Sequence, residues 1–269
     1  MNSVLITIPV RNEAEFLDAS FRQIVRGLEG SGLNYRLSIA EDGSSDGTPD
    51  VIRGLQADYP GLLVRTSRER LGRGCALRQI WSEVDADIYA FADADLAAGP
   101  PALIRVISEV AHGADVATGS RYCEGALVRR PPLRQQVSLA YNRLVRMAFG
   151  GSIRDHQCGL KAFSRDAKSK LFAMTRENSW AWDTEVLVLA ERAGMRVVEV
   201  PVEWTEYRGK RTPLRRLLSD IYLHGAALLR LKSDLQNRMG SKQVRPTVGF
   251  AARPVDLVGP QDAGSGHLR

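Results

Sequence analysis

The sequence of 269 residues has no apolar run that approaches the ~20 residues needed to cross a membrane. Its three cysteines, Cys75, Cys123 and Cys158, are odd in number and widely separated, which argues against a disulfide framework. No group of cysteines and histidines has the spacing of a zinc site. The first ten residues lack the basic start and the cleavage site of a secretory signal. These absences predict a cytoplasmic protein without structural zinc.

Motifs for nucleic-acid binding are also missing, as are basic runs interleaved with aromatic residues. The chain is nevertheless basic, with a formal net charge of +6. A charge of this sign suits nucleic acid, an anionic membrane surface or phosphorylated ligands. Because the basic residues gather in short groups, at 65–73, 129–134 and 208–216, we favour phosphorylated ligands and expect no nucleic acid as a partner.

The first half of the chain alternates apolar runs with amphipathic segments. The continuous apolar run at residues 4–10 is typical of a parallel strand that is buried on both faces. Further strands are expected at 35–40, 62–66, 88–92 and 116–118, with helices between them. Thr48 and Pro49 predict a helix start with Thr48 as the N-cap. This alternation indicates an α/β fold with a doubly wound, mostly parallel sheet.

The pattern changes after residue 122. Helices are expected at 135–149, at 166–174 and from 179 to about 193, and strands at 160–163 and 197–204. A long helix with leucines at helical spacing is expected from Pro213 to about Gln236. Beyond Gly240 the composition turns to Gly, Pro and isolated polar residues. We therefore predict one domain over residues 1–236, with halves at 1–122 and 123–236, and a disordered tail at 237–269.

Candidate functional residues gather at the expected carboxyl ends of the strands. Asp93 and Asp95 follow the strand at 88–92, and their spacing would put both side chains on one face of an extended segment. Two such carboxylates repel each other, and a hard divalent cation that carries nucleotide phosphates would relieve this. Ligands of parallel α/β sheets bind outside this edge. The other candidates there are Pro9, Arg11, Glu13, Asp42, Gly72, Gly74 and Arg121.

Several of these acids also have simpler interpretations, which the sequence leaves open. Glu13 and Asp42 could be ordinary helix caps. Asp155 could merely shape a turn with Gln157. Asp183 could cap the helix that follows it, with Glu185 in the first turn, where a carboxylate interacts favourably with the helix dipole.

An ordered series of motifs resembles the family 2 glycosyltransferases of the GT-A fold. In the first half these are IPVRNE (8–13), EDGSSDGT (41–48), RLGRGCAL (70–77) and DAD (93–95). In the second half, GSRY (119–122), DHQCGLKAF (155–163), WAWDTE (180–185) and EVPVEW (199–204) resemble the polyprenyl-phosphate hexosyltransferases, which include dolichyl-phosphate β-glucosyltransferases and dolichol-phosphate mannose synthases. The resemblance covers about residues 4–231.

This resemblance implies metal-dependent, inverting transfer of a hexose, glucose or mannose, from UDP or GDP to a polyprenyl phosphate. Residues 1–122 would bind the nucleotide sugar, and residues 123–236 would bind the acceptor. The donor site would comprise Pro9, Arg11, Glu13, Asp42, Gly72, Gly74, Asp93, Ala94, Asp95 and Arg211, with Asp42 reading the base. Mg²⁺ or Mn²⁺ would bind between Asp93 and Asp95. Two positions depart from the family pattern, because Lys210 replaces a serine and Arg11 an aromatic residue.

The class of acceptor determines which catalytic groups are needed. The oxygen of a lipid phosphate is already anionic, so it needs no general base but needs cations, for which the candidates are Arg121, Arg129, Arg130, Arg134, Lys210 and Arg211. A hydroxyl acceptor, the nearest alternative, would need a carboxylate such as Asp183 or Glu185 to take its proton. A non-enzymatic nucleic-acid-binding protein is the remote alternative.

Arginines beside the leucines of the helix expected from Pro213 suggest contact with the inner face of a membrane, from which a lipid acceptor would be reached. Packing of this helix on the core of the protein is the alternative.

Overall fold

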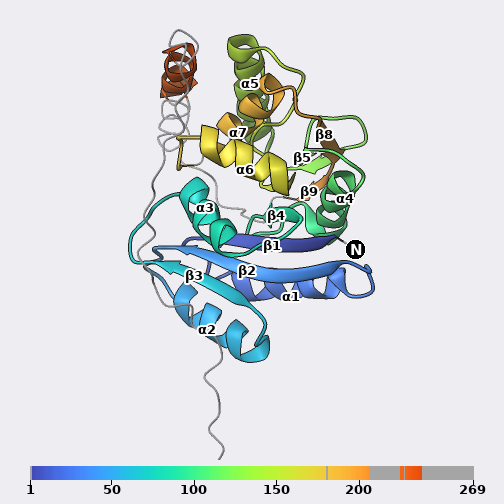
Figure 1. The fold of residues 1–269 in the computed structure, drawn as a ribbon, viewed down its shortest axis with the longest axis vertical. Coiled ribbons are helices and arrows are strands. Elements are labelled where there is room, and N and C mark those ends of the chain that lie inside the picture. Colours follow the sequence, from blue (N-terminus) through green and yellow to red (C-terminus); the bar gives the residue numbers. More distant parts are fainter. Residues whose placement is uncertain (1, 180, 206–224, 227, 238–269) are drawn as a thin grey trace, which may run out of the picture.

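The computed structural model describes residues 2–179, 181–205, 225–226 and 228–237. At its centre lies a seven-stranded sheet in the order β3-β2-β1-β4-β7-β5-β8 (Figure 1). β7 is antiparallel to both of its neighbours, and the other strands are parallel. The strands are β1 (Ser3–Val10), β2 (Asn34–Asp42), β3 (Leu63–Ser67), β4 (Ile88–Ala92), β5 (Val116–Ser120), β7 (Leu160–Ser164) and β8 (Val197–Pro201). The predicted α/β fold with a mostly parallel sheet is confirmed.

Helices cover both faces of the sheet, and each face has its own apolar core. The first core lies against α1 (Leu17–Leu28), α2 (Thr48–Asp58) and α4 (Gly99–Ala111). The second lies against α3 (Arg73–Glu83), α5 (Pro132–Phe149), α6 (Arg165–Met174) and α7 (Trp182–Arg192).

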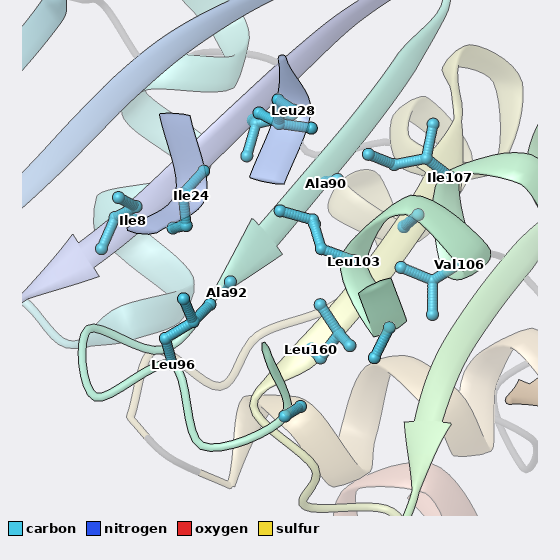
Figure 2. Packing of buried hydrophobic residues seen from close by; sticks show 14 of the residues in the cluster. Ile8, Ile24, Leu28, Ala90, Ala92, Leu96, Leu103, Val106, Ile107 and Leu160 are labelled. Atoms are coloured by element: carbon cyan, nitrogen blue, oxygen red, sulfur yellow. The ribbon is translucent and has the colours of Figure 1, made fainter. Parts of the chain in front are cut away.

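Strand β1 contributes to both cores because successive side chains of a strand point to opposite faces. Ile6 and Ile8 belong to the first core, whereas Leu5 belongs to the second. Figure 2 shows Ile8 close to Ile24 of α1 and Leu103 of α4 on the other side of the cluster. This two-sided burial explains why the strand is a continuous apolar run.

The chain after β8 differs from the expectation of one strand over 197–204. The strand ends at Pro201, and β9 (Glu203–Thr205) pairs instead with β6 (Leu127–Arg129), which the sequence did not predict. At the break, the fully buried Val202 connects the two sheets: its amide donates to the carbonyl of Ser120, and its carbonyl accepts from the amide of Leu127.

Two predicted helix starts are also corrected. Thr48 is the first residue of α2 and not its N-cap; its amide and hydroxyl both donate to Asp46 Oδ1, so the preceding aspartate satisfies the helix start. Helix α5 begins at Pro132, three residues before the expected start, because a proline fits the first turn of a helix.

The helix expected over 213–236 is described only at residues 225–226 and 228–237, and these residues are helical. Leu231 and Leu235 are buried in the second core, so this part packs on the protein itself. None of the described helices has the length and hydropathy that a membrane span requires. Residue 237, the first of the predicted tail, is still helical, and residues 238–269 lie outside the described residues. The predicted domain limits stay a prediction.

Candidate active site

The carboxyl ends of β1 and β2 meet at one edge of the sheet and, with the start of α3, line a cavity of about 180 Å³. Five of the predicted donor residues line it. They are Pro9, Arg11, Glu13, Asp42 and Gly72, and the remaining lining residues are Val10, Arg70, Arg73, Ala76 and Ser179. Gly74 lies one residue into α3, where a side chain would overlap the indole of Trp182. The expectation that ligand-binding residues gather at the carboxyl ends of strands therefore grouped residues that are up to 63 positions apart in the sequence and that line one cavity.

Asp42 positions the loop that closes this cavity. Its carboxylate accepts hydrogen bonds from the backbone amides of Leu71 and Gly72 at 2.5–3.1 Å. Gly72 has a φ of +92°, and a Cβ there would overlap the carbonyl of Asn178. Asp42 is thus engaged by the protein backbone, and its reading of a base stays a prediction.

Asp93 and Asp95 lie in a turn directly after β4, where the amide of Leu96 donates to the carbonyl of Asp93. The expectation of an extended segment is therefore wrong, and the common-face argument from i, i+2 spacing does not apply to this backbone. The backbone of Asp93 is fixed by the residue before β7, because its amide donates to the carbonyl of Gly159 at 2.8 Å. Because β7 is antiparallel, it begins beside the end of β4, so Leu160 pairs with Ala92.

A guanidinium occupies the position next to these aspartates. Arg73 Nη2 lies 2.7 Å from Asp93 Oδ1, and its Nη1 lies 2.7 Å from Asp183 Oδ2. The other oxygen of Asp183 accepts from Lys161 Nζ at 2.8 Å, and Lys161 also donates to the carbonyl of Cys158. Lys161 is fully buried in strand β7. The four residues form a chain of alternating charge, Asp93–Arg73–Asp183–Lys161, which we call the charge chain.

Burial raises the pKa of Asp93 to about 6; the negative charges of Asp95 and Asp183 add to this effect, while Arg73 and Lys161 oppose it. The same environment favours any cation that reaches the carboxylate. No group of three metal-ligating side chains occurs among the described residues. Two carboxylates, with the remaining positions left to water and diphosphate, are the donor set that Mg²⁺ and Mn²⁺ accept. The residues present therefore fit a divalent cation at Asp93 and Asp95.

The two candidate general bases are both engaged within the protein. Asp183 is buried in the first turn of α7 and holds Arg73 and Lys161, so the helix-cap interpretation is wrong. Glu185 is buried and accepts from the backbone amides of Arg176 and Glu177 at 2.8–3.2 Å. It holds the segment that contacts the start of α3, since the amide of Gly74 donates to the carbonyl of Asn178.

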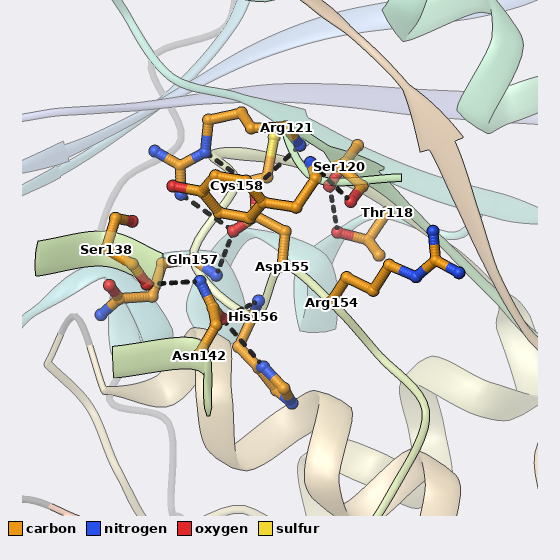
Figure 3. Close-up of polar contacts among 12 residues, drawn as sticks. Thr118, Ser120, Arg121, Ser138, Asn142, Arg154, Asp155, His156, Gln157 and Cys158 are labelled. Carbon is orange, nitrogen blue, oxygen red and sulfur yellow. Dashed lines mark hydrogen bonds and ion pairs between the residues drawn. The ribbon is translucent and has the colours of Figure 1, made fainter. Parts of the chain in front are cut away.

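Arg121 lies at the end of β5, where Asp155 holds it in a buried ion pair. Its Nε and Nη2 donate to the two carboxylate oxygens at 2.7 and 2.8 Å, and its amide donates to the same carboxylate (Figure 3). Burial by itself would raise the pKa of Asp155, but the charge and hydrogen bonds of Arg121 hold it below the usual value. Asp155 therefore orients Arg121, which is more than the turn that the sequence suggested.

The structure describes three of the five remaining predicted acceptor residues. Arg129 is exposed on β6, Arg130 follows it half-buried, and Arg134 is half-buried in the first turn of α5. Lys210 and Arg211 lie outside the described residues. The three cysteines are free, as expected, and burial raises the pKa of Cys158 to about 12, which makes it a poor nucleophile.

Sequence reasoning missed Arg73 and Lys161 as residues of the site. Arg73 was counted only in a basic group, although it follows Gly72 at the start of a helix. Lys161 interrupts the apolar strand LKAFS, and a lysine in a strand that is buried on both faces needs an anionic partner. That interruption was the available signal.

Comparison with known proteins agrees with this geometry. The family described as Glycosyl transferase family 2 matches residues 5–172. The chain belongs to this family. It is 38% identical over 230 residues to glycosyltransferase AglD of Haloferax volcanii, a match that covers 84% of the chain and 36% of AglD. The family membership makes the non-enzymatic nucleic-acid-binding alternative wrong.

Two further glycosyltransferases are similar over most of the chain. A dolichyl-phosphate beta-glucosyltransferase of Trichomonas vaginalis, ALG5A, is 26% identical over 251 residues, covering 89% of the chain and 75% of that protein. Glucosyl-3-phosphoglycerate synthase of Mycobacterium tuberculosis, solved with Mn²⁺, UDP and phosphoglyceric acid, superposes with a TM-score of 0.64 at 18% identity, covering 86% of the chain and 78% of that structure. This last likeness establishes the GT-A fold.

Proposed function

We propose that this family 2 glycosyltransferase moves a hexose from UDP or GDP to a polyprenyl phosphate, with inversion at the anomeric carbon and with a divalent cation. The observation that carries the choice of acceptor is the state of Asp183 and Glu185. Both carboxylates are buried and bonded within the protein, so neither is placed to take a proton from a hydroxyl. A phosphate acceptor needs no such base.

The donor half of the reaction requires stabilisation of the departing nucleoside diphosphate. A divalent cation at Asp93 and Asp95 would act as a Lewis acid on the diphosphate. Arg73 lies in the wall of the cavity and can donate two hydrogen bonds to the same phosphates. Binding of manganese and UDP by the structurally similar phosphoglycerate enzyme supports this assignment.

The acceptor half requires cations that bind a lipid phosphate opposite the leaving group. Asp155 fixes the guanidinium of Arg121, whose Cζ also lies 5.0 Å from the ring centre of Trp204. Arg129, Arg130 and Arg134 follow between β6 and the first turn of α5, in the same half of the chain as the DHQCGLKAF segment. The dolichyl-phosphate beta-glucosyltransferase that the chain resembles supports a lipid phosphate as the acceptor.

The test is a panel of UDP- and GDP-linked glucose and mannose, each offered with a short polyprenyl phosphate, the matching polyprenol, or phosphoglycerate, with products identified by mass. We expect transfer to the polyprenyl phosphate alone and an inverted anomeric configuration. Asp95→Asn should lower turnover about a hundredfold or more, because it removes charge from the metal site. Transfer to a hydroxyl acceptor with no transfer to any lipid phosphate would overturn the proposal.

A further inference from the structure

Arg73 connects the nucleotide cavity to the metal aspartates. It lies in the first turn of α3 and lines the cavity, while one nitrogen of its guanidinium contacts Asp93 and another contacts Asp183. Its side chain is 27% exposed and lines the cavity. A single group thus touches both the place for the diphosphate and a proposed ligand of the cation.

The charge chain is asymmetric around Arg73. Asp183 has a second cationic partner, the fully buried Lys161, and this contact does not depend on Arg73. Lys161 donates its hydrogen bonds to Asp183 and to the carbonyl of Cys158, whereas Asp93 Oδ1 is the oxygen that Arg73 contacts. If the guanidinium moved toward the cavity, Asp183 would stay neutralised while Asp93 would lose a hydrogen-bonded cation.

A divalent cation and Arg73 compete for the same carboxylate oxygen. A cation on Asp93 Oδ1 would replace the Arg73 contact, and the adjacent guanidinium charge repels a cation at either oxygen, so Arg73 lowers the affinity of the unliganded protein for the cation. A diphosphate offers the guanidinium two parallel hydrogen bonds to anionic oxygens, which are stronger partners than one carboxylate oxygen. Movement of Arg73 onto the diphosphate would therefore leave the Asp93 oxygen accessible to the cation.

We propose that Arg73 couples the two binding events by exchanging partners: it neutralises Asp93 in the unliganded protein and transfers to the diphosphate when the nucleotide binds. This rests on the proposed function, in that the donor is a nucleotide diphosphate. Couplings of this kind are typically about 5- to 150-fold in affinity and act equally in both directions. The exchange would keep a free divalent cation from occupying the site before the donor arrives.

Isothermal titration of Mn²⁺, UDP and GDP, each alone and in pairs, tests the exchange in the wild type and in Arg73→Met. Because diphosphate also binds Mn²⁺ directly, the decisive readouts are the single-ligand affinities. In Arg73→Met we expect Mn²⁺ alone to bind about fivefold more tightly or better, and nucleotide alone to bind about fivefold more weakly or worse. A purely structural role for Arg73 would weaken both.

Arg78→Met is the matched control, because Arg78 lies on the same helix and contacts Thr175 and Asn178 but not Asp93. It should leave the Mn²⁺ affinity as in the wild type. Arg73→Lys retains one positive charge but lacks the two-pronged geometry of a guanidinium, so its affinities for Mn²⁺ alone and for nucleotide alone should lie between those of the wild type and Arg73→Met. If Arg73→Met does not melt cooperatively, the affinities of Arg73→Lys test the exchange instead.

Unchanged or weaker binding of Mn²⁺ alone by folded Arg73→Met and Arg73→Lys would overturn the exchange. Failure of UDP and GDP to bind the wild type in the presence of Mn²⁺ would instead count against the proposed function. The Mn²⁺ titrations without nucleotide still decide whether Arg73 competes with the cation in that case.

Discussion

Four charged side chains in the interior of this protein form two defined pairs. Lys161 with Asp183 and Arg121 with Asp155 are all buried, and each pair is closed at 2.7–2.8 Å. Removing one partner of such a pair typically costs about 3–5 kcal/mol, because the other charge is left buried without compensation. Asp183 also holds Arg73, which contacts Asp93, and Asp155 fixes the proposed acceptor residue Arg121, so both pairs orient the site and make it intolerant of single substitutions.

In contrast to these buried ion pairs, His156 is a buried titratable group that is neutral in the folded protein. Its backbone amide and Nδ1 both donate to Asn142 Oδ1, and the Asn142 amide is in turn fixed by the carbonyl of Ser138 (Figure 3). Burial lowers the pKa of His156 to about 4, and the charges of Lys161 and Arg146 act in the same direction. The folded protein therefore excludes the proton that the unfolded chain binds below its ordinary pKa of 6.5.

This predicts a pH dependence of stability. Between the ordinary pKa of 6.5 and the folded value of about 4, the unfolded state binds more protons, so the free energy of unfolding decreases as the pH falls. The full contribution is about 3 kcal/mol. Urea unfolding at pH 7, 5.5 and 4.5 should show a steeper loss for the wild type than for His156→Gln. Equal slopes in the two proteins would contradict this prediction.

At the scale of elements, the reversal of β7 shapes the site. A parallel strand in this position would end beside β4, whereas the antiparallel β7 begins there and places Cys158, Gly159 and Lys161 behind the aspartate turn. Gly159 has no room for a side chain, because a Cβ would overlap the carboxylate of Asp93. The backbone of one element thereby determines the position of a carboxylate on another.

Gly159→Ala should displace the Asp93 carboxylate without removing it. We expect the affinity for Mn²⁺ in the presence of UDP to fall about 10- to 100-fold, the range seen when groups that orient metal ligands are changed. Gly54→Ala is the matched control, since a Cβ at Gly54 of α2 meets nothing within 4 Å. It should keep the wild-type affinity, and a helix-interior alanine should add about 0.5–1 kcal/mol to stability. A normal Mn²⁺ affinity for Gly159→Ala would show that the turn can adapt.

For the molecule as a whole, apolar exposure is concentrated on the flank formed by β6 and α5. Leu127, Leu133, Leu144 and Met147 are exposed there, Met147 to 75%, beside the basic group at 129–134. Apolar side chains with neighbouring arginines are typical of surfaces that lie on anionic membranes. The described part of the C-terminal helix contributes Leu231 and Leu235 to the core and leaves Leu229 71% exposed.

We therefore predict that the full chain floats with vesicles that contain anionic lipid more than with neutral vesicles. Recovery should fall as salt rises, because the screening length shortens from about 10 Å at 0.1 M to about 3 Å at 1 M salt. The combined variant Leu133→Gln, Leu144→Gln and Met147→Gln should reduce flotation while retaining the wild-type melting temperature within a few degrees, since all three side chains are exposed. Undiminished flotation of this variant would exclude the β6–α5 flank as the contact surface.

Much of the architecture followed from local patterns in the sequence. The apolar run of β1, the alternation of strands with helices and the rule that ligands bind at carboxyl strand ends were sufficient to predict the sheet and to place Pro9, Glu13 and Asp42 around one cavity. Apolar residues recur every two residues in a strand and every three or four in a helix, so the local sequence is enough to predict these elements. The motif series at those strand ends likewise predicted the family that the comparisons confirmed.

The partners of the polar groups were decided only by the tertiary structure. Arg73 and Asp183 are 110 residues apart, and Arg121 and Asp155 are 34 apart, so no local period connects them. Asp42 lines the cavity as expected and also holds a loop that the sequence did not predict, because the Gly72 turn brings two amides within 3.1 Å of its carboxylate. The sequence by itself determined which residues reach the edge of the sheet. Only the tertiary structure decides which of them remain accessible to a ligand. A buried charge or amide must be paired, and its partner is the polar group that packing places beside it.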